Sequence, residues 1–312
     1  MCKEHIKAIN QVLKNSRKTL PVLQCLAHQD GKLMATDLTV MVQVDTPNIA
    51  DGIWKSTALD YGFSDETKST EFTLDDYPEL DLKEIKQEIE LTSEDLKKIL
   101  FASKFVSKDL TRPILTGVAI KGHMVYASDG YRMYKDRLSN ELSFTIIFPS
   151  ECLKVLTAVA ADKRNWTLTL YENDQVALKS GNFTLYSKLI DGRIPEYDML
   201  CANNTTFEEC IDLDLKSLTI PKGYYIRLDR VERKLYLYNQ DTKEKITVGT
   251  DIPTSNGQVD RTDKREIVMA MIGDKEREVI VDPNLLKPYG KKHIKLYANT
   301  KSGFVDIKVL DK

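Results

Sequence analysis

The sequence has few of the residues that build metal centres and covalent cross-links. Its 312 residues include only five cysteines and four histidines, and these are scattered, without a Cys-x-x-Cys pair or histidines at metal-ligand spacing. The cysteine usage also gives no reason to expect an oxidising compartment. The sequence therefore predicts no zinc site, no disulfide framework and no cofactor.

Long apolar runs and the glycine-rich signatures of nucleotide-binding or hydrolytic enzymes are absent too. No segment is apolar enough to predict a membrane span, and the polar start with Glu4 and His5 does not resemble a signal peptide, so we expect a cytoplasmic protein. Neither Gly-x-x-x-x-Gly-Lys-(Ser/Thr) nor Gly-x-Ser-x-Gly occurs. Gly290-Lys291-Lys292 is better interpreted as a helix end with compensating cations than as a phosphate loop.

Charge of neither sign dominates. Lysine and arginine number 45 against 47 acidic residues, for a net charge of −2. A nucleic-acid partner would therefore require basic residues gathered on one face, because phosphate binding depends on the local field. The length predicts two or three domains, since one core rarely grows beyond about 250 residues.

The most informative feature is a duplicated template. The first copy starts with Thr19-Leu20-Pro21-Val22-Leu23 and ends with Ala35-Thr36-Asp37; the second starts with Thr111-Arg112-Pro113-Ile114-Leu115 and ends with Ala127-Ser128-Asp129. In both, sixteen positions separate the proline from the aspartate. A shared pattern at a shared spacing indicates a repeated structural unit.

Each copy follows an amphipathic helical stripe and leads into alternating strands. Ile6, Ile9 and Val12 precede the first copy, and Leu96 and Ile99 precede the second. Thr92 or Ser93 is placed to cap the second helix, and Asp30-Gly31 and Lys121-Gly122 are turn dipeptides that predict hairpins. Later, Thr145–Phe148 before Pro149 and Val279–Asp282 before Pro283 each predict a strand that leads into a helix, followed by alternating strands. The chain is predicted to be an α+β array of helix-plus-strand units.

Asp37 and Asp129 are the best candidates for catalytic carboxylates, because they recur in both copies. Each, however, stands at a strand end before a turn, where aspartate commonly accepts hydrogen bonds from backbone N–H groups. We favour this structural role. No catalytic constellation is apparent, and the sequence predicts a binding protein, not an enzyme.

Three segments in the middle of the chain carry a resemblance to a known family. Thr111–Gly117, Ala127–Arg132 and Ser187–Tyr197 are similar, in order and spacing, to the middle domain of the bacterial sliding clamp, the β subunit of DNA polymerase III. Thr19–Val44 and Phe72–Pro78 resemble the clamp's first domain. The resemblance implies a DNA clamp fold of three clamp-like domains, at residues 1–88, 89–202 and 203–312, with helices on the inner face and sheets outside.

The resemblance also implies two functional surfaces. Basic residues at the helix ends would contact duplex DNA without sequence preference: Lys14, Arg17, Lys18, Lys104, Lys108 and Arg112. From the residues alone, a solvated lysine-rich helix face is the simpler interpretation. A hydrophobic cleft would bind short peptide motifs of polymerase and clamp loader through Leu115, Ser128, Gly130, Tyr131, Arg132, Met133, Pro195, Met199, Leu200, Val309 and Leu310. Taken singly, Leu115, Met133 and Leu200 are more typical of ordinary core residues, and only their joint placement by the motifs favours a cleft.

The chain departs from the family pattern in two places. Residues 45–71 and the start of the third domain, Phe207–Arg230, are too short for the helices that family members carry, and Asp198 and Met199 stand where those proteins often have basic residues. We therefore expect a DNA polymerase processivity factor acting in DNA replication, a homodimeric ring around duplex DNA. The alternative is a clamp relative that does not encircle DNA, a monomer in place of the homodimer, which binds clamp-seeking peptides as a regulator, decoy or scaffold.

Overall fold

The computed structural model divides the chain into two compact units, each described by itself. Unit 1 comprises residues 1–103, 110–125 and 138–192, and unit 2 comprises residues 104–109, 126–137 and 193–312. The structure describes residues 1–16, 20–159, 164–203, 206–207, 209–249, 257–258, 265–272, 278–299 and 303–310. These two units are defined by how the chain packs. The predicted domain boundaries at 88/89 and 202/203 come from the family resemblance and remain a prediction.

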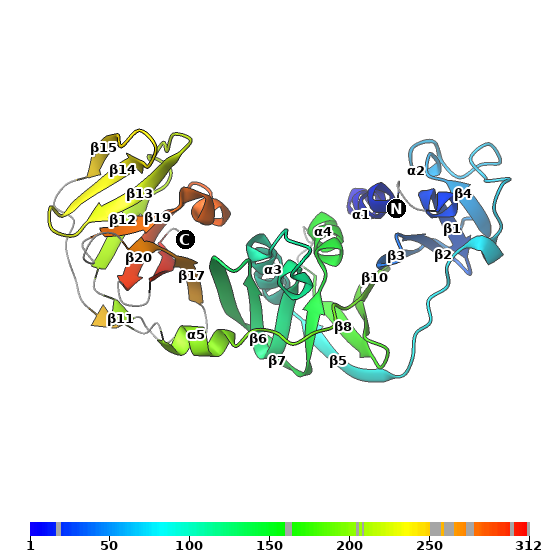
Figure 1. Cartoon of the computed structure of the whole chain (residues 1–312). Helices are drawn as coiled ribbons and strands as arrows, with labels where there is room; N and C mark the ends of the chain where they lie inside the picture. The colour runs from blue at the N-terminus through cyan, green and yellow to red at the C-terminus, as the bar shows by residue number, and fades with distance from the viewer. Residues whose placement is uncertain are drawn as a thin grey trace. The chain divides into compact units, whose positions relative to one another are not determined.

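Unit 1 is built on an antiparallel eight-stranded sheet, in which strands of the first template copy pair with strands from later in the chain (Figure 1). The strand order is β4-β1-β2-β3-β10-β9-β8-β5. The strands are β1 (Cys25–Gln29), β2 (Lys32–Thr36), β3 (Val40–Asp45), β4 (Gly52–Lys55), β5 (Ile85–Leu91), β8 (Trp166–Tyr171), β9 (Gln175–Ser180) and β10 (Phe183–Lys188). The seam is the β3–β10 pair, which runs from Val44 opposite Phe183 to Val40 opposite Ser187.

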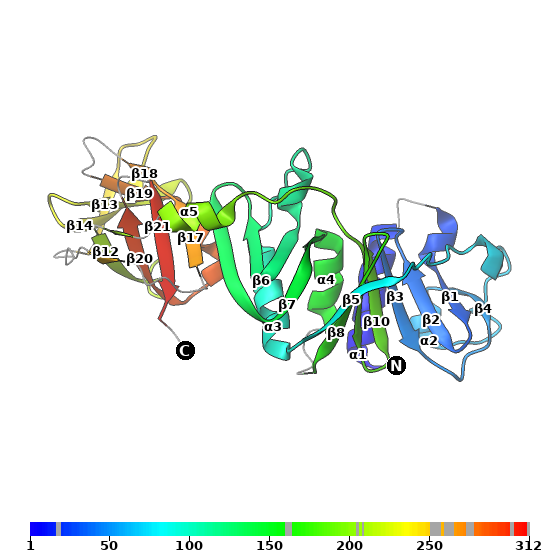
Figure 2. The same ribbon diagram turned by 90° about the horizontal axis from the view of Figure 1, so that it is seen from below.

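Helices of unit 1 pack on one face of these strands. α1 (Lys3–Ser16) lies beside α4 (Ser150–Val159) and contacts β2 and β3, and α3 (Ser93–Ala102) contacts α4 and β5 (Figures 1 and 2). The predicted helical stripe of the first copy is confirmed, since Ile9 and Val12 of α1 are fully buried. Amphipathic helices of this kind gain most of their stability by burying the apolar stripe against a sheet.

The predicted cap of the second helix is confirmed, and Thr92 provides it. Its hydroxyl accepts from the backbone N–H of Asp95 at 3.1 Å, and the Asp95 carboxylate accepts from the backbone N–H of Thr92 at 3.0 Å. This reciprocal capping box satisfies two helix-end donors. Asp95 also accepts from the backbone N–H and hydroxyl of Ser139, at 2.9 and 3.1 Å, so the cap ties α3 to β7.

Proline marks the break after each repeat helix, as predicted. A 3-10 turn, η1 (Pro21–Gln24), follows α1, while η3 (Ser103–Phe105) and η4 (Pro113–Thr116) follow α3. The Asp30-Gly31 hairpin is also confirmed: both residues have positive φ, 51° and 75°, between β1 and β2. This is the backbone conformation of the tight hairpin turns.

Unit 2 contains a six-stranded sheet in the order β12-β20-β21-β17-β7-β6 and a five-stranded sheet in the order β15-β14-β13-β19-β18. The portions of β6 and β7 next to the turn that joins them belong to this unit. The strands are β6 (Val118–Ser128), β7 (Arg132–Phe148), β11 (Thr206–Phe207), β12 (Glu209–Asp214), β13 (Tyr224–Asp229), β14 (Lys234–Asn239), β15 (Lys245–Gly249), β16 (Gly257–Gln258), β17 (Arg265–Met269), β18 (Met271–Ile272), β19 (Glu278–Val281), β20 (His293–Asn299) and β21 (Phe304–Val309).

One local prediction is wrong. Lys121-Gly122 does not form a hairpin turn: β6 continues through it, and Gly122 takes a φ of 60° inside the strand, so the glycine accommodates an irregularity and not a chain reversal. Pro283 starts a helix after β19, as predicted, and this helix is of the 3-10 type, η6 (Pro283–Tyr289). Pro288 inside η6 has no N–H to donate, which prevents regular α-helical hydrogen bonding.

The first and third parts of the chain are short of helix, as the sequence indicated. Between β4 and β5 the longest helix is α2 (Ala58–Tyr61), of four residues, beside the 3-10 turn η2 (Leu74–Asp76). From Thr206 to Leu310, η6 is the helix that the described residues contain. The connector to this part carries α5 (Tyr197–Asn203).

Candidate functional site

The ends of the two template copies form the same turn, which confirms the duplication at the level of hydrogen bonds. Asp37 Oδ1 accepts from the backbone N–H groups of Thr39 and Val40, at 3.0 and 2.8 Å. Asp129 Oδ1 accepts from the backbone N–H groups two and three residues onward, Tyr131 and Arg132, both at 3.0 Å. The two carboxylates therefore have the structural role that we favoured over catalysis.

The residue before each aspartate repeats its own pattern as well. The Thr36 hydroxyl donates to the Val40 carbonyl and the Ser128 hydroxyl to the Arg132 carbonyl, both at 2.8 Å. Each hydroxyl also accepts from the N–H two residues onward. The hydroxyl of the predicted cleft residue Ser128 thus makes both of these hydrogen bonds within its own turn. Gly130 follows at the tip, with a φ of 93° that a glycine adopts without strain.

Two of the predicted cleft residues next to this turn differ sharply in exposure. Tyr131 is 58% exposed, whereas Met133 is only 2% exposed and pairs with Ile267 across β7 and β17. The Arg132 guanidinium binds the Asp129 carboxylate, with Nε to Oδ2 at 2.7 Å, and lies 5.4 Å from the Phe105 ring centroid. Tyr131 is therefore the side chain of this segment that is most exposed to solvent.

Strand register shows two residues beside Tyr131 that the sequence did not point to. The backbone N–H of Met269 donates to the Tyr131 carbonyl at 2.7 Å, and Met269 pairs with Phe304. Met269 is 41% exposed and Phe304 is partly exposed. No motif marks either residue, because their proximity to Tyr131 arises only when β17 pairs with β7 and β21.

The connector helix α5 is fastened to the sheet of unit 2 by aromatic and ionic contacts. Tyr197 stacks on Tyr126 with the ring centroids 5.3 Å apart. The Asp198 carboxylate accepts from the Tyr126 hydroxyl at 3.0 Å and binds Lys135 Nζ at 2.7 Å. Burial and the Asp198 carboxylate raise the pKa of Tyr126, so this hydroxyl stays protonated and donates. The acidic residue noted in the sequence thus holds α5 in place.

A second attachment of α5 is a buried ion pair. Arg265 of β17 binds Asp306 of β21 through two hydrogen bonds, Nε to Oδ1 at 2.8 Å and Nη2 to Oδ2 at 2.7 Å. Arg265 Nη1 also donates to the Cys201 carbonyl of α5 at 3.3 Å. Bidentate pairs of this kind fix geometry as well as charge.

The other predicted cleft residues of unit 2 lie near α5. Met199, in the first turn of α5, is 62% exposed, and Pro195 is exposed just before it. The side chain of Leu200 lies outside the described residues. Val309 is the last residue of β21, at the opposite end of that strand from Phe304, and Leu310 follows it and is exposed. The register therefore places Tyr131 at one end of the β7-β17-β21 ladder and Val309 at the other.

Leu115 belongs to unit 1, in η4, and is partly exposed.

The predicted DNA-contacting residues fall into three groups. Lys14, in the last turn of α1, and Arg112, before η4, are exposed on unit 1. Lys104 and Lys108 are exposed on unit 2. Arg17 and Lys18 lie outside the described residues. Further along the helical face of unit 1, Lys97 pairs with Glu94 at 3.2 Å and Lys154 with Glu151 at 3.8 Å, so several of its cations are locally balanced.

The described residues contain neither a metal-binding cluster nor a membrane-spanning helix. No group of three or more histidine, cysteine, aspartate or glutamate side chains is placed there to hold a metal ion. None of the helices in this part of the chain has the length and apolar character required to cross a membrane.

Comparison with known proteins extends the resemblance. No protein-family model matches the chain. The β sliding clamp of Streptococcus pneumoniae serotype 4 is 32% identical over 122 residues, which are 36% of this chain and 32% of that protein. The β sliding clamp of Bacillus subtilis is 28% identical over 143 residues, 43% of this chain and 38% of that protein. The chain thus spans only about a third of the length of these curated relatives.

Solved structures match over almost the whole chain. The DNA polymerase III β subunit of Thermotoga maritima superimposes with a TM-score of 0.68 at 14% identity, covering 99% of this chain and 97% of that one. The DNA polymerase sliding clamp of Bacillus subtilis gives a TM-score of 0.66 at 16% identity, with 98% and 96% coverage. The chain is thus similar to bacterial β sliding clamps over part of its sequence and has the clamp fold over nearly all of its length.

Proposed function

We propose that the protein is a sliding clamp, a non-catalytic processivity factor that encircles duplex DNA and tethers a DNA polymerase. The observation that carries this proposal is the clamp fold itself, which extends over nearly the whole chain and contains the duplicated helix-plus-sheet unit. In this proposal each subunit contributes three clamp-like domains, at residues 1–88, 89–202 and 203–312, and two subunits close the ring in the cytoplasm.

The helical face of unit 1 supports contact with DNA. α1, α4 and α3 lie on one side of the eight-stranded sheet, and α1 carries three lysines and a single glutamate. Lysine contacts to phosphates gain the same counterion-release energy at every step along the duplex, so binding has no sequence preference and permits sliding. Because some of these cations are paired with carboxylates, the affinity of this face for DNA would be modest. The ring topology would then account for the residence time of the protein on DNA.

The exposed apolar residues of unit 2 support a peptide cleft. Tyr131, Met269 and Phe304 gather at one end of the β7-β17-β21 ladder, and the α5 region adds Pro195 and Met199. Exposed aromatic and methionine side chains are typical of surfaces that anchor short linear motifs, here those of polymerase and clamp loader.

Ring formation is tested by solution mass and by retention on DNA. We expect a mass of two subunits at micromolar concentration, and retention on nicked circular DNA after loading by a clamp loader. The same circle cut once should release the protein, because a ring can slide off an end. A monomeric mass without retention on the circle would contradict the ring.

The cleft is tested with a peptide of the Gln-x-x-Leu-Phe type. Met133 is unsuitable for substitution, because an aspartate at this buried position would test folding. Tyr131→Ala and Met199→Ala change exposed side chains, and we expect each to weaken binding more than about fivefold if it is an anchor. Tyr61→Ala is the matched control, since Tyr61 is 82% exposed on unit 1. Unchanged affinity in both cleft variants would place the peptide elsewhere.

The second candidate function is a clamp relative that binds clamp-seeking peptides without encircling DNA, as a regulator, decoy or scaffold. The reduced helices favour it: α2 has four residues, and η6 is the helix of the described residues from Thr206 to Leu310. Peptide binding by a monomer that is not retained on circular DNA would support this function over the ring.

A further inference from the structure

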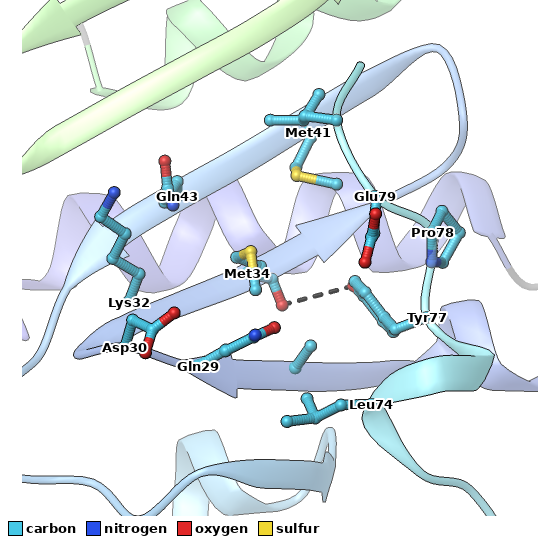
Figure 3. Close-up of a pocket in the computed structure, with 12 residues that line it drawn as sticks. Gln29, Asp30, Lys32, Met34, Met41, Gln43, Leu74, Tyr77, Pro78 and Glu79 are labelled. Atoms are coloured by element: carbon cyan, nitrogen blue, oxygen red, sulfur yellow. Dashed lines mark hydrogen bonds between the residues drawn. The ribbon is translucent and has the colours of Figure 1, made fainter. Parts of the chain in front are cut away.

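The outer face of the first template copy carries two adjoining hollows. The side chains of Met34 and Met41 lie on the side of the sheet away from α1, as Figure 3 shows for the first hollow. That hollow has a volume of about 310 Å³, and the second, toward β10, about 380 Å³. They share four lining residues, Met41, Pro78, Glu79 and Leu80, so the connector after η2 forms the rim between them.

The second copy explains why these hollows remain open. Met34 and Met41 correspond to Tyr126 and Met133, each ninety-two positions later. There the connector forms α5, Tyr197 covers Tyr126, and Tyr126 is 2% exposed, whereas Met34 in the first copy is partly exposed. In the first copy the connector forms no such helix. The connector of the first copy passes over the sheet and is held there by Tyr77. Tyr77 is buried, and its hydroxyl donates to the Met34 carbonyl at 3.4 Å.

The lining combines apolar side chains with charges of both signs. Ala27, Met34, Leu74 and Tyr77 give the first hollow its apolar contacts, and methionine adapts to side chains of different shape. Asp30 and Lys32 also line the first hollow, and Asp81 and Lys188 line the second. Glu79 is exposed and lines both hollows. Its carboxylate forms no ion pair within the described part of the chain, so it is placed to receive a cation between two apolar contacts.

The connector also has backbone groups to offer. Among the described residues, the backbone N–H and C=O groups of Glu79 and Leu80 take part in no hydrogen bond. An extended peptide lying along the connector can pair with such groups, while its alternate side chains enter pockets. A free backbone edge beside side-chain pockets is a geometry that binds peptides. The backbone hydrogen bonds in such a site do not depend on the sequence of the peptide.

We propose that the two hollows form a groove for an extended peptide that places an aliphatic side chain in each hollow and a lysine or arginine against Glu79. This groove lies on unit 1 and is separate from the predicted cleft of unit 2. It goes beyond the proposed function, since it gives the first copy a peptide site of its own with a preference for basic segments.

Methyl NMR of the full chain labelled with ¹³C at its eight methionines tests the groove. The probe is a blocked peptide, Leu-Thr-Lys-Thr-Leu, whose first, third and fifth side chains lie on one side when extended. We expect the Met34 and Met41 signals, assigned with Met34→Leu and Met41→Leu, to shift and saturate, while the Met133 signal stays in place. Stationary Met34 and Met41 signals at millimolar peptide would overturn the proposal.

The charge preference has its own test. Glu79→Gln should weaken the lysine peptide about two- to fivefold, the range expected for an exposed ion pair. Glu66→Gln, an exposed carboxylate outside both hollows, is the matched control and should leave the affinity unchanged. A peptide with glutamate in place of lysine should bind more weakly than the lysine peptide. Equal binding of the two peptides would overturn the role given to Glu79.

Discussion

Asp95→Asn should destabilise the protein by about 2–3 kcal/mol at pH 7. The Asp95 side chain is fully buried, and its two oxygens accept four hydrogen bonds of 2.8 to 3.1 Å, two from Thr92 and two from Ser139. An asparagine replaces one oxygen by an NH2 group, so whichever way the amide is turned, one backbone N–H loses its acceptor. An unpaired buried donor costs about 1–3 kcal/mol, and the remaining bonds lose their charge assistance.

The effect should also depend on pH. Burial alone would raise the pKa of Asp95, but the hydrogen bonds from Thr92 and Ser139 outweigh it and hold the pKa below its ordinary value of 3.8. A carboxyl with a lowered pKa in the folded state stabilises the protein above its unfolded pKa, and this stabilisation is lost as the pH falls through the folded value. The difference between wild type and Asp95→Asn should therefore shrink below about pH 4.

Urea unfolding followed by far-ultraviolet circular dichroism, at pH 7 and in steps toward pH 3, measures both effects. Asp76→Asn is the matched control. Asp76 forms the same reciprocal cap with Thr73, at 2.8 and 2.9 Å, but it is exposed and has no counterpart of Ser139. Its substitution should cost clearly less. The reasoning is refuted if Asp95→Asn costs no more than Asp76→Asn, or if its cost is the same at every pH.

Three further predictions concern the repeat turn, the buried ion pair and the helical face. Leu38→Gly should stabilise by up to about 1 kcal/mol, because Leu38 has a φ of 75° where the second copy has Gly130, and the strain relieved exceeds the added chain entropy; a loss in urea unfolding would contradict this. Arg265→Met should cost about 3–5 kcal/mol by leaving Asp306 buried and unpaired, and Arg265→Met with Asp306→Leu should recover most of it; a double variant as unstable as the single one would contradict the account. Lys14→Ala should reduce the slope of log affinity for duplex DNA against log salt concentration by about one per contact, for every DNA sequence. The control Lys83→Ala should leave this slope unchanged. An unaltered slope for Lys14→Ala would mean that Lys14 does not contact DNA.

Local chemistry was the part of this structure that could be predicted from the sequence. The turns at Asp37 and Asp129, the cap at Thr92 and the hairpin at Asp30-Gly31 each depend on hydrogen bonds between residues at most four positions apart, so their residue types signal them directly. Pro288 likewise indicates from the sequence that the helix after Pro283 is not a regular α-helix.

Features that depend on distant pairing could not be predicted in the same way. Met269 and Phe304 join Tyr131 only through the register of β17 with β7 and β21, and nothing in their own neighbourhood specifies that register. Asp198 attracted notice as a departure from the family pattern, but its bonds to Tyr126 and Lys135 join residues more than sixty positions apart. The hollows beside the connector likewise depend on where Tyr77 meets β2.

The β3–β10 seam has a consequence for how the chain is made. β3 ends at Asp45, yet its partner β10 starts at Phe183, so roughly 140 residues must leave the ribosome before the strand is covered. At about 5–20 residues per second, this edge stays open for about 7–30 seconds. During that interval Val40, Val42 and Val44 present an unpaired edge of the kind that holdase chaperones and neighbouring nascent chains bind.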